Sequence, residues 1–338
     1  MTEKQYGGKT GRESKKVIEN RKEILVLSEG LKKVKMSTEE KKAITYEDFM
    51  SLKEAGKIAK EVANYAKSII RPNVKLLEIA EKIEDKIMSL GGKPAFPVNL
   101  SINDIAAHYT PSWNDETLAS GLLKIDMGVH VNGFIADTAF SIDLEGKEEN
   151  KKLIELSENA VKKAIEVVKF GIPVGEVGKA IGEVITSKGF SPIRNLTGHE
   201  VKRYLLHSGL SIPNYNNGNT AKLSEGVYAI EPFVTNGQGI VYESKPSGIY
   251  IFKERKGVRD RLAREILDYI ENEYLSLPFC SRWLIKKFSP KALFALAALK
   301  QAGCIEEFMQ LVEKSKKPVA QAEHTFVVFK DKIEVTTR

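Results

Sequence analysis

The sequence of 338 residues predicts an α+β protein made of two similar helix–helix–sheet halves, with a helical insertion in the second half. Three observations carry this prediction. Segments 77–91 and 176–189 repeat one pattern at a constant offset of 98 residues, both lead into β-rich stretches, and residues 248–317 turn helical. A hydrophobic content of 42% lets a chain of this length bury one large core.

The first 42 residues differ in composition from the rest of the chain. They hold twelve Lys or Arg and seven Glu, and so carry +5 of the formal net charge of +7. This composition predicts a flexible basic extension over residues 1–45, ahead of a folded domain over 46–338. Two interpretations of the extension stay open: a solubilising appendage, or an electrostatic tether to ribosomal RNA.

The repeat predicts two amphipathic helices, each with isoleucines on one face and a glycine at its end. The matched positions are Glu78/Glu176, Ile83/Ile181, Ile87/Ile185, Ser89/Ser187 and Gly91/Gly189. Each copy follows another helix, which ends near Pro72 or Pro173. Any two amphipathic helices look alike, but His108 and His207 also correspond, at an offset of 99. We therefore expect the two halves to bring one histidine each towards a shared cleft.

Residues 122–142 read as two β-rich runs around Asn132-Gly133, a strong hairpin signal. A turn there pairs residues whose numbers sum to 265, so Asp137 lies opposite Gly128 and on the same face as Asp126. The two aspartates are then diagonal neighbours, roughly 7–8 Å apart at the backbone. Like charges on one face favour a cation between them. The alternative is two solvated aspartates on an exposed face.

Three more ionisable residues lie in short apolar segments, where an unpaired charge is costly: His199, Glu231 and Glu323. Each alone could be a core polar residue whose hydrogen bonds are satisfied. Together with the two aspartates they provide one imidazole and four carboxylates, a set that suits two first-row divalent ions. A zinc finger is excluded because the chain has only two cysteines.

Seven ordered blocks between Tyr46 and Arg338 resemble the methionine aminopeptidases, specifically type II. The blocks are FPVNLSINDIAAHYTP (96–111), KIDMG (124–128), IADT (135–138), GH (198–199), LHSGLSIP (206–213), AIEP (229–232) and AEHT (322–325). The type II assignment rests on AAHYTP and on the separation of Glu231 and Glu323 by 92 positions. Ser208 departs from the family pattern, which has alanine there.

The resemblance implies the pita-bread fold and removal of the N-terminal methionine from nascent proteins when the second residue is small. The resemblance also implies two divalent metal ions, which would be Co, Mn, Fe or Zn. Asp126 would hold one ion, His199 and Glu231 the other, and Asp137 and Glu323 would bridge them. A water between the ions would attack the carbonyl after the first methionine.

The resemblance also assigns roles around the implied ions. Glu231 would take the proton of the water, and His207 would hydrogen-bond the developing oxyanion. His108 would contact the scissile amide and the leaving side; its counterpart in the family is alkylated by fumagillin-type epoxides. Phe96 and Leu206 would line the methionine pocket.

The two remaining histidines are expected to serve other purposes. His130 lies beside the predicted hairpin turn, and we expect it at the surface. His324 follows Glu323 in a strand and so points to the opposite face, which favours a structural role.

Residues 248–317 predict a helical, winged-helix-like insertion between two of the ligands. Apolar residues recur at helical spacing over 261–270, Ser289-Pro290 suits an N-cap and first helical position, and Gly303 ends that helix. In the family this segment walls one side of the cleft. DNA binding through it is an alternative, but helix periodicity alone is poor evidence, so no specific DNA partner is expected.

Two further alternatives concern the activity. An Xaa-Pro aminopeptidase or prolidase would use the same ligands, but the AAHYTP and LHSGL blocks argue against it. A non-catalytic, ribosome-associated protein of the same fold would be expected to lack ligands that are intact in this chain. The expected partners are nascent polypeptide N-termini. The two cysteines without a disulfide framework, and the lack of an apolar run of membrane-spanning length or a secretory signal, predict a cytoplasmic protein.

Overall fold

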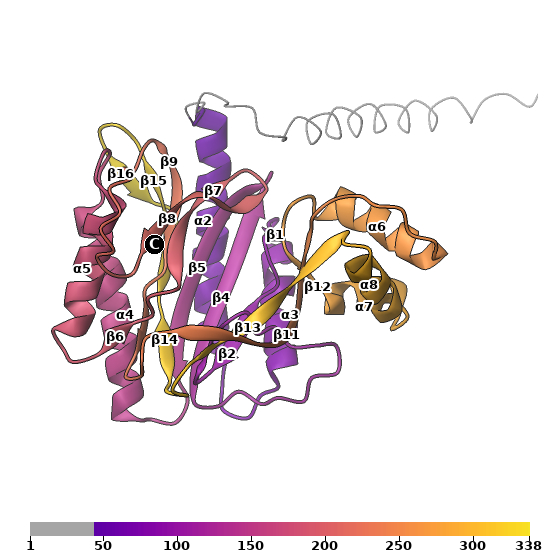
Figure 1. Cartoon of the computed structure of the whole chain (residues 1–338), viewed down its shortest axis with the longest axis horizontal. Helices are drawn as coiled ribbons and strands as arrows, with labels where there is room; N and C mark the ends of the chain where they lie inside the picture. The colour runs from indigo at the N-terminus through magenta and orange to yellow at the C-terminus, as the bar shows by residue number, and fades with distance from the viewer. Residues whose placement is uncertain (1–43) are drawn as a thin grey trace, which may run out of the picture. The chain divides into compact units, whose positions relative to one another are not determined.

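The computed structural model describes residues 44–338, so almost all of the predicted basic extension lies outside the described residues. Within them, helices pack on one side of a curled nine-stranded sheet and a group of three helices lies beside it (Figure 1). In the same part of the chain, no helix is both long and apolar enough to cross a membrane.

The first half runs from two helices into five strands. Its elements are α2 (Tyr46–Ile69), α3 (Leu76–Ser89), β1 (Lys93–Pro94), β2 (Asn99–Ile102), β3 (Ile105–Ala107), β4 (Leu122–Val131) and β5 (Phe134–Asp143). A capping box starts α2: the Thr45 hydroxyl accepts from the Asp48 backbone N–H, and the Asp48 carboxylate accepts from the Thr45 N–H.

The second half repeats this order and confirms the predicted duplication. Its elements are α4 (Glu148–Val167), α5 (Val174–Thr186), β6 (Ser191–Pro192), β7 (Thr197–Lys202), β8 (Leu205–Pro213), β9 (Gly226–Ile230) and β10 (Phe233–Thr235). Three late strands complete the sheets: β14 (Val319–Gln321), β15 (Glu323–Val328) and β16 (Ile333–Val335). Gly91 and Gly189, after α3 and α5, both adopt the left-handed conformation that ends a helix, with φ of 85° and 79°.

The large sheet has the strand order β1-β4-β5-β15-β9-β7-β8, with β2 also pairing with β4 and β16 with β15. The two halves meet where β5 pairs with β15. The predicted hairpin register is confirmed, because Asp126 lies opposite Ala139 and Asp137 lies opposite Gly128. Along β4 the odd-numbered residues from 123 to 129 are apolar and buried, whereas Lys124 and Asp126 face the other way.

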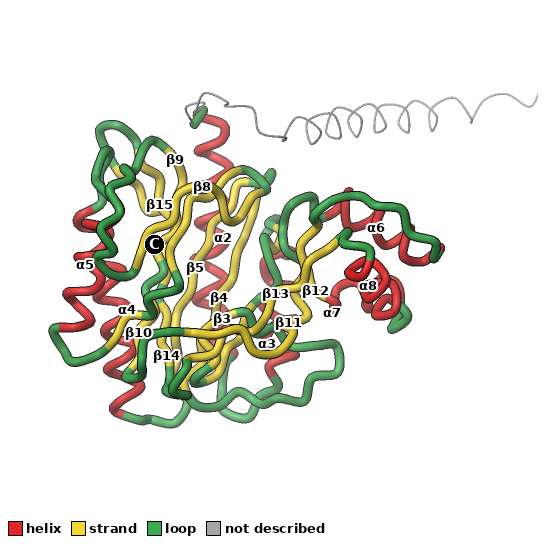
Figure 2. Tube along the Cα trace, in the orientation of Figure 1, coloured by secondary structure: helices red, strands yellow, loops and turns green. Residues whose placement is uncertain are grey.

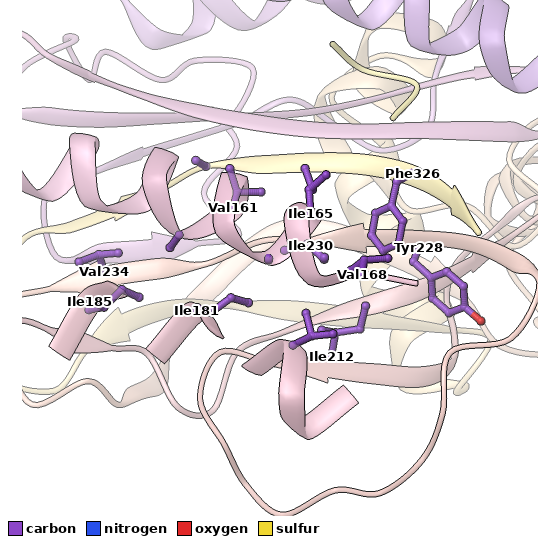
Figure 3. Packing of buried hydrophobic residues seen from close by; sticks show 14 of the residues in the cluster. Val161, Ile165, Val168, Ile181, Ile185, Ile212, Tyr228, Ile230, Val234 and Phe326 are labelled. Atoms are coloured by element: carbon purple, nitrogen blue, oxygen red, sulfur yellow. The ribbon is translucent and has the colours of Figure 1, made fainter. Parts of the chain in front are cut away.

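Two hydrophobic clusters bury the helix-covered face of this sheet. One joins α2 and α3 to β4 and β5, and the other joins α4 and α5 to β8, β9 and β15. In the second cluster Ile165 of α4 and Ile181 of α5 pack towards Ile230, beside the stacked rings of Tyr228 and Phe326 (Figure 3). Helices α2 to α5 cover this face of the sheet, and they leave its opposite face, to which Lys124 and Asp126 point, uncovered by helices (Figure 2).

The helical insertion has its own core. Its elements are β11 (Val241–Phe252), α6 (Arg261–Glu273), β12 (Phe279–Cys280), α7 (Ser281–Phe288), α8 (Ala292–Gln301) and β13 (Ile305–Glu313). All three helices lie within the predicted segment 248–317, although β11 begins earlier. Strands β11 and β13 pair with each other, and β13 also pairs with β3, which ties the insertion to the first half.

Two local predictions are wrong. Ser289 does not cap α8: it has a φ of 74° and ends α7, whereas α8 begins at Ala292 with Lys291 as its N-cap residue. His130 is not a surface residue, since it is 8% exposed. The Tyr204 ring covers it edge-on at 5.7 Å, and its Nδ1 accepts a hydrogen bond from the Gly133 N–H.

Helix α5 approaches the chain after β8 so closely that a side chain does not fit at one position. A Cβ on Gly178 would lie 2.3 Å from the Tyr215 carbonyl oxygen. Alanine normally stabilises a helix interior relative to glycine by ~0.5–1 kcal/mol. We predict the opposite sign for Gly178→Ala, a loss of roughly 1–3 kcal/mol in the free energy of unfolding measured by urea denaturation.

Gly182, one turn later in α5, provides the control for this prediction. The nearest atom to a Cβ there is 3.3 Å away. Gly182→Ala should therefore change stability far less than Gly178→Ala. Equal stability of the two variants would contradict the close approach.

Candidate active site

The five predicted metal ligands line one cavity of about 340 Å³. The predicted substrate-contacting residues line the same cavity: Phe96, His108, Leu206 and His207. His324 does not line it; its Nδ1 lies 2.9 Å from the Thr337 hydroxyl on the other face of β15. The structure thus gathers all nine candidate residues from segments far apart in the sequence.

Five neighbouring strands of the large sheet supply one predicted ligand each. In sheet order, β4 carries Asp126, β5 carries Asp137, β15 begins with Glu323, β9 is followed by Glu231, and β7 carries His199. The register of the strands sets their common face: Asp126 and Glu323 both lie opposite Ala139, and His199 lies opposite Ala229. The small side chains of these two alanines take up little space between the ligands.

The ligand atoms lie at separations that suit shared ions. One donor atom each from Asp137, His199 and Glu323 lies within 4.8 Å of the others. His199 Nε2 is 3.6 Å from both Asp137 Oδ2 and Glu231 Oε1. This separation is too long for a hydrogen bond. It is the separation expected for two atoms that bind the same ion, each at about 2.0–2.2 Å.

Burial dominates the electrostatics of these side chains. It raises the pKa of Asp126 to about 7 and the pKa of Asp137, Glu231 and Glu323 well above the usual range. Repulsion between the carboxylates adds to the pKa increase of the last three. Burial also lowers the pKa of His199 to about 3, so its imidazole is neutral near pH 7.

Several polar atoms of the predicted ligands are buried without a hydrogen-bond partner among the described residues. They are Asp126 Oδ1, Asp137 Oδ1, Glu323 Oε1 and His199 Nδ1. Unsatisfied buried oxygens on mutually repelling carboxylates are costly, and divalent cations remove both costs at once. The residues present therefore fit divalent metal ions.

One buried side chain in this group was missed from the sequence. Gln321 is 1% exposed, and its amide Nε2 donates to Asp126 Oδ2 at 3.5 Å and to Glu231 Oε2 at 3.4 Å. Its backbone is fixed by Ser141, whose hydroxyl donates to the Gln321 carbonyl oxygen and accepts from the Gln321 N–H. The available signal was its position two residues before Glu323, because alternate residues of an extended segment point to the same side.

Hydroxyl groups hold the junction between β5 and β15. The Thr325 hydroxyl accepts from the Asp137 N–H and donates to the Asp137 carbonyl oxygen, both at 2.8 Å. The Thr138 hydroxyl donates to the Glu323 carbonyl oxygen at 2.9 Å. The backbones of two predicted ligands are therefore fixed by side chains from the opposite strand.

The two histidines from the duplicated halves face the same cavity. The His207 ring lies edge-on to His199, with ring centroids 4.3 Å apart. It is exposed to the cavity, but the surrounding protein reduces its hydration and lowers its pKa to about 4. His108 is held at Nδ1, 3.1 Å from the Met309 carbonyl oxygen. Because a carbonyl only accepts, Nδ1 is the protonated nitrogen of a neutral His108, and Nε2 is an acceptor.

Apolar side chains form much of the rest of the cavity wall, alongside four polar ones, Asn99, Asn195, Thr197 and Ser211. Phe96 and Leu206 belong to a buried cluster, and Phe96 lies against β4 because position 128 is glycine: a Cβ there would be 2.4 Å from the Phe96 ring. The segment from β11 to β13 adds Ile249, Pro278 and Phe308. No motif in the sequence pointed to these three residues.

Comparison with known proteins agrees with this arrangement. The model of metallopeptidase family M24 matches residues 50–261. The methionine aminopeptidase of Pyrococcus abyssi is 48% identical over 295 residues, which are 86% of this chain and 99% of the relative. The methionine aminopeptidase of Methanocaldococcus jannaschii is 44% identical over 295 residues, with the same two coverages.

Solved structures share the fold. A methionine aminopeptidase from Thermotoga maritima superposes with a TM-score of 0.65 at 22% identity, covering 88% of this chain and 99% of that one. A thermophilic Arx1 superposes with a TM-score of 0.75 at 15% identity, covering 87% and 91%. Such distant likenesses establish the architecture alone. The family model and the closely similar relatives go further, and the chain therefore belongs to metallopeptidase family M24, within its methionine aminopeptidases.

Proposed function

We propose that this methionine aminopeptidase is a type II enzyme that acts on nascent polypeptides with a small second residue, and that two divalent ions assist the hydrolysis. One observation carries the assignment of residues. Five adjacent strands bring four carboxylates and one imidazole to a single cavity whose remaining wall is partly apolar.

The proposed ligand roles are those that the family resemblance implies. Asp137 and Glu323 would be shared between the ions, with Asp126 completing one site and His199 and Glu231 the other. Support comes from His199 Nε2, which lies equally far from Asp137 and Glu231. When bound, the ions would lower the pKa of a water and polarise the peptide carbonyl, and Co, Mn, Fe or Zn suits this donor set.

The remaining roles fall to groups that touch the peptide or the attacking water. Glu231 would accept the proton of the water. His207 is neutral near pH 7 because its pKa is about 4, and it would donate its single N–H to the carbonyl oxygen as negative charge develops. His108 would offer Nε2 as an acceptor to the peptide on the leaving side. Phe96 and Leu206 would contact the methionine side chain.

The proposed partners are nascent polypeptide N-termini. The tether to ribosomal RNA falls on residues 1–42, outside the described residues, and rests on their charge of +5 alone. It stays a prediction, as does a cytoplasmic location.

A coupled assay on short peptides tests the function. Met-Ala-Ser should be cleaved and Met-Lys-Ser left whole, and chelation should abolish cleavage until Mn, Co or Fe is added back. Full activity of a thoroughly metal-free preparation would exclude the mechanism. Faster cleavage of Xaa-Pro peptides without methionine would favour the aminopeptidase P or prolidase alternative.

The proposed roles of His207 and Asp137 predict different defects. His207→Ala removes a donor to the oxyanion but no ligand, so kcat should fall by ~10²–10³ with metal content unchanged. Asp137→Asn should instead lose metal, because a shared carboxylate becomes a neutral amide. Metal content by elemental analysis and kcat on Met-Ala-Ser measure both; normal kcat in the first variant would disprove the donor role.

The raised pKa of Asp126 predicts an unusual pH dependence for the metal-free protein. The folded state holds the Asp126 proton up to about pH 7, whereas the unfolded chain releases it near pH ~4. The folded state therefore binds more protons between these values, and its stability falls as the pH rises through this window.

Asp126→Asn isolates this contribution, because it removes the ionisation and keeps an acceptor for Gln321. In metal-free protein the variant should unfold at a higher temperature than the unaltered chain at pH 8, and at nearly the same temperature at pH 4. Divalent metal should reverse the order at pH 8. A pH-independent difference between the two proteins would show that Asp126 is not held protonated.

A further inference from the structure

A buried ion pair joins the helical insertion to the first half of the protein. Glu84 of α3 and Arg282 of α7 are 4% and 3% exposed. Their contact is two-pronged: Arg282 Nη1 lies 2.6 Å from Glu84 Oε2, and Nη2 lies 2.8 Å from Oε1. The Trp283 indole N–H also donates to Glu84 Oε2, at 2.8 Å. Neither charged residue lines the active-site cavity.

Both partners also bond to the segments that enter the active site. Arg282 Nε donates to the Pro111 carbonyl oxygen at 3.2 Å, and Nη2 lies 3.4 Å from the Thr110 hydroxyl. Glu84 Oε1 accepts from the Val98 N–H at 3.3 Å. The Thr110 hydroxyl in turn donates to the Val98 carbonyl oxygen at 2.8 Å. The ion pair therefore cross-links residues 96–98 and 108–111.

These two segments carry cavity residues. Phe96 stands two residues before Val98, and His108 stands two residues before Thr110. A small shift of either bonded residue would move the neighbouring cavity side chain, and a misplacement of about 1 Å can cost a large factor in rate.

His108 depends on such support because its backbone is strained. Its φ is +63°, a left-handed conformation that costs a residue with a Cβ about 1–2 kcal/mol. Such conformations persist only where the surroundings impose them. Before His108, Ala107 pairs with Leu311 of β13, and the His108 ring is held by the Met309 carbonyl. After His108, the Tyr109 carbonyl oxygen accepts from the Leu100 N–H at 2.7 Å, and Arg282 bonds to the next two residues, Thr110 and Pro111.

The internal repeat shows that this helix position does not require a charge. At the offset of 98, Glu84 corresponds to Gly182 in α5, which faces the Tyr215 backbone instead. A buried ion pair is also weak evidence for stability, because well-packed apolar residues of similar volume often stabilise as well. The pair therefore calls for an explanation other than helix packing.

We propose that Arg282, anchored by Glu84, is a positioning residue that holds His108 in its working geometry. Arg282, which does not line the cavity, would thus contribute to catalysis without touching the substrate. The inference rests on the role proposed above for His108.

Two variants test the proposal, chosen so that the protein still folds. Arg282→Lys keeps a positive charge beside Glu84 but lacks the planar fork that reaches Thr110 and Pro111 together. The double variant Glu84→Gln, Arg282→Met leaves no unpaired buried charge and keeps an acceptor for the Val98 N–H. Arg255→Met is the matched control, since Arg255 pairs within the insertion, with Asp268 and Glu271.

Steady-state kinetics on Met-Ala-Ser, metal content and thermal unfolding should be measured for each variant. Arg282→Lys and the double variant should lower kcat roughly tenfold, with metal content unchanged. Arg255→Met should leave kcat unchanged. An unaltered kcat in both test variants would overturn the proposal.

A double-mutant cycle separates positioning from general damage. If Arg282 acts through His108, then Arg282→Lys should add less than a twofold loss to His108→Ala. Multiplicative losses would mean general damage and overturn the proposal. If His108→Ala alone left kcat unchanged, the proposed role of His108 would fail, and this inference with it. If kcat fell in His108→Ala but stayed normal in the Arg282 variants, the role of Arg282 would be disproved and the proposed role of His108 would stand.

Discussion

The mutual repulsion of four carboxylates around one cavity is the constraint on which the rest of the structure depends. Asp126, Asp137, Glu231 and Glu323 lie on one face of the sheet with their pKa values raised. Without a cation this arrangement favours protonation or separation of the groups. The helices on the other face of the sheet, the hydroxyl bonds between β5 and β15, and the Gln321 amide all oppose that separation.

Local patterns predicted much of the fold, and the family resemblance selected the nine candidate residues that line the cavity. The Asn132-Gly133 turn set the register of β4 and β5, and a shift of one residue would have moved Asp126 to the helix-covered face. The duplicated helices could be recognised because both bury isoleucines with the same spacing. Each candidate residue lies in a short motif of the family. That they share one cavity was expected from the family resemblance, because nothing in the sequence itself shows which distant segments come together.

The parts that could not be predicted depend on partners distant in the sequence. Glu84 and Arg282 are 198 residues apart, and neither lies in a motif. His130 looked exposed because the turn beside it is polar, but Tyr204 of the other half covers it. Ser289 carried the chemistry of an N-cap, yet the tight connection between α7 and α8 placed it in a left-handed conformation. In all three cases the conformation or burial depends on tertiary packing. For His130 and Ser289 this packing overrides the local sequence signal.

The junction between β5 and β15 also determines when the site can exist during synthesis of the chain. Asp126 and Asp137 lie in the first half, whereas Glu323 lies in a strand that is made almost two hundred residues later. A growing chain that ends before β15 holds only three of the four carboxylates, and its β5 lacks a partner on one side. Ions that met this chain early would find weak and open coordination. The predicted ligand set is therefore complete only once β15 has been made and can pair with β5.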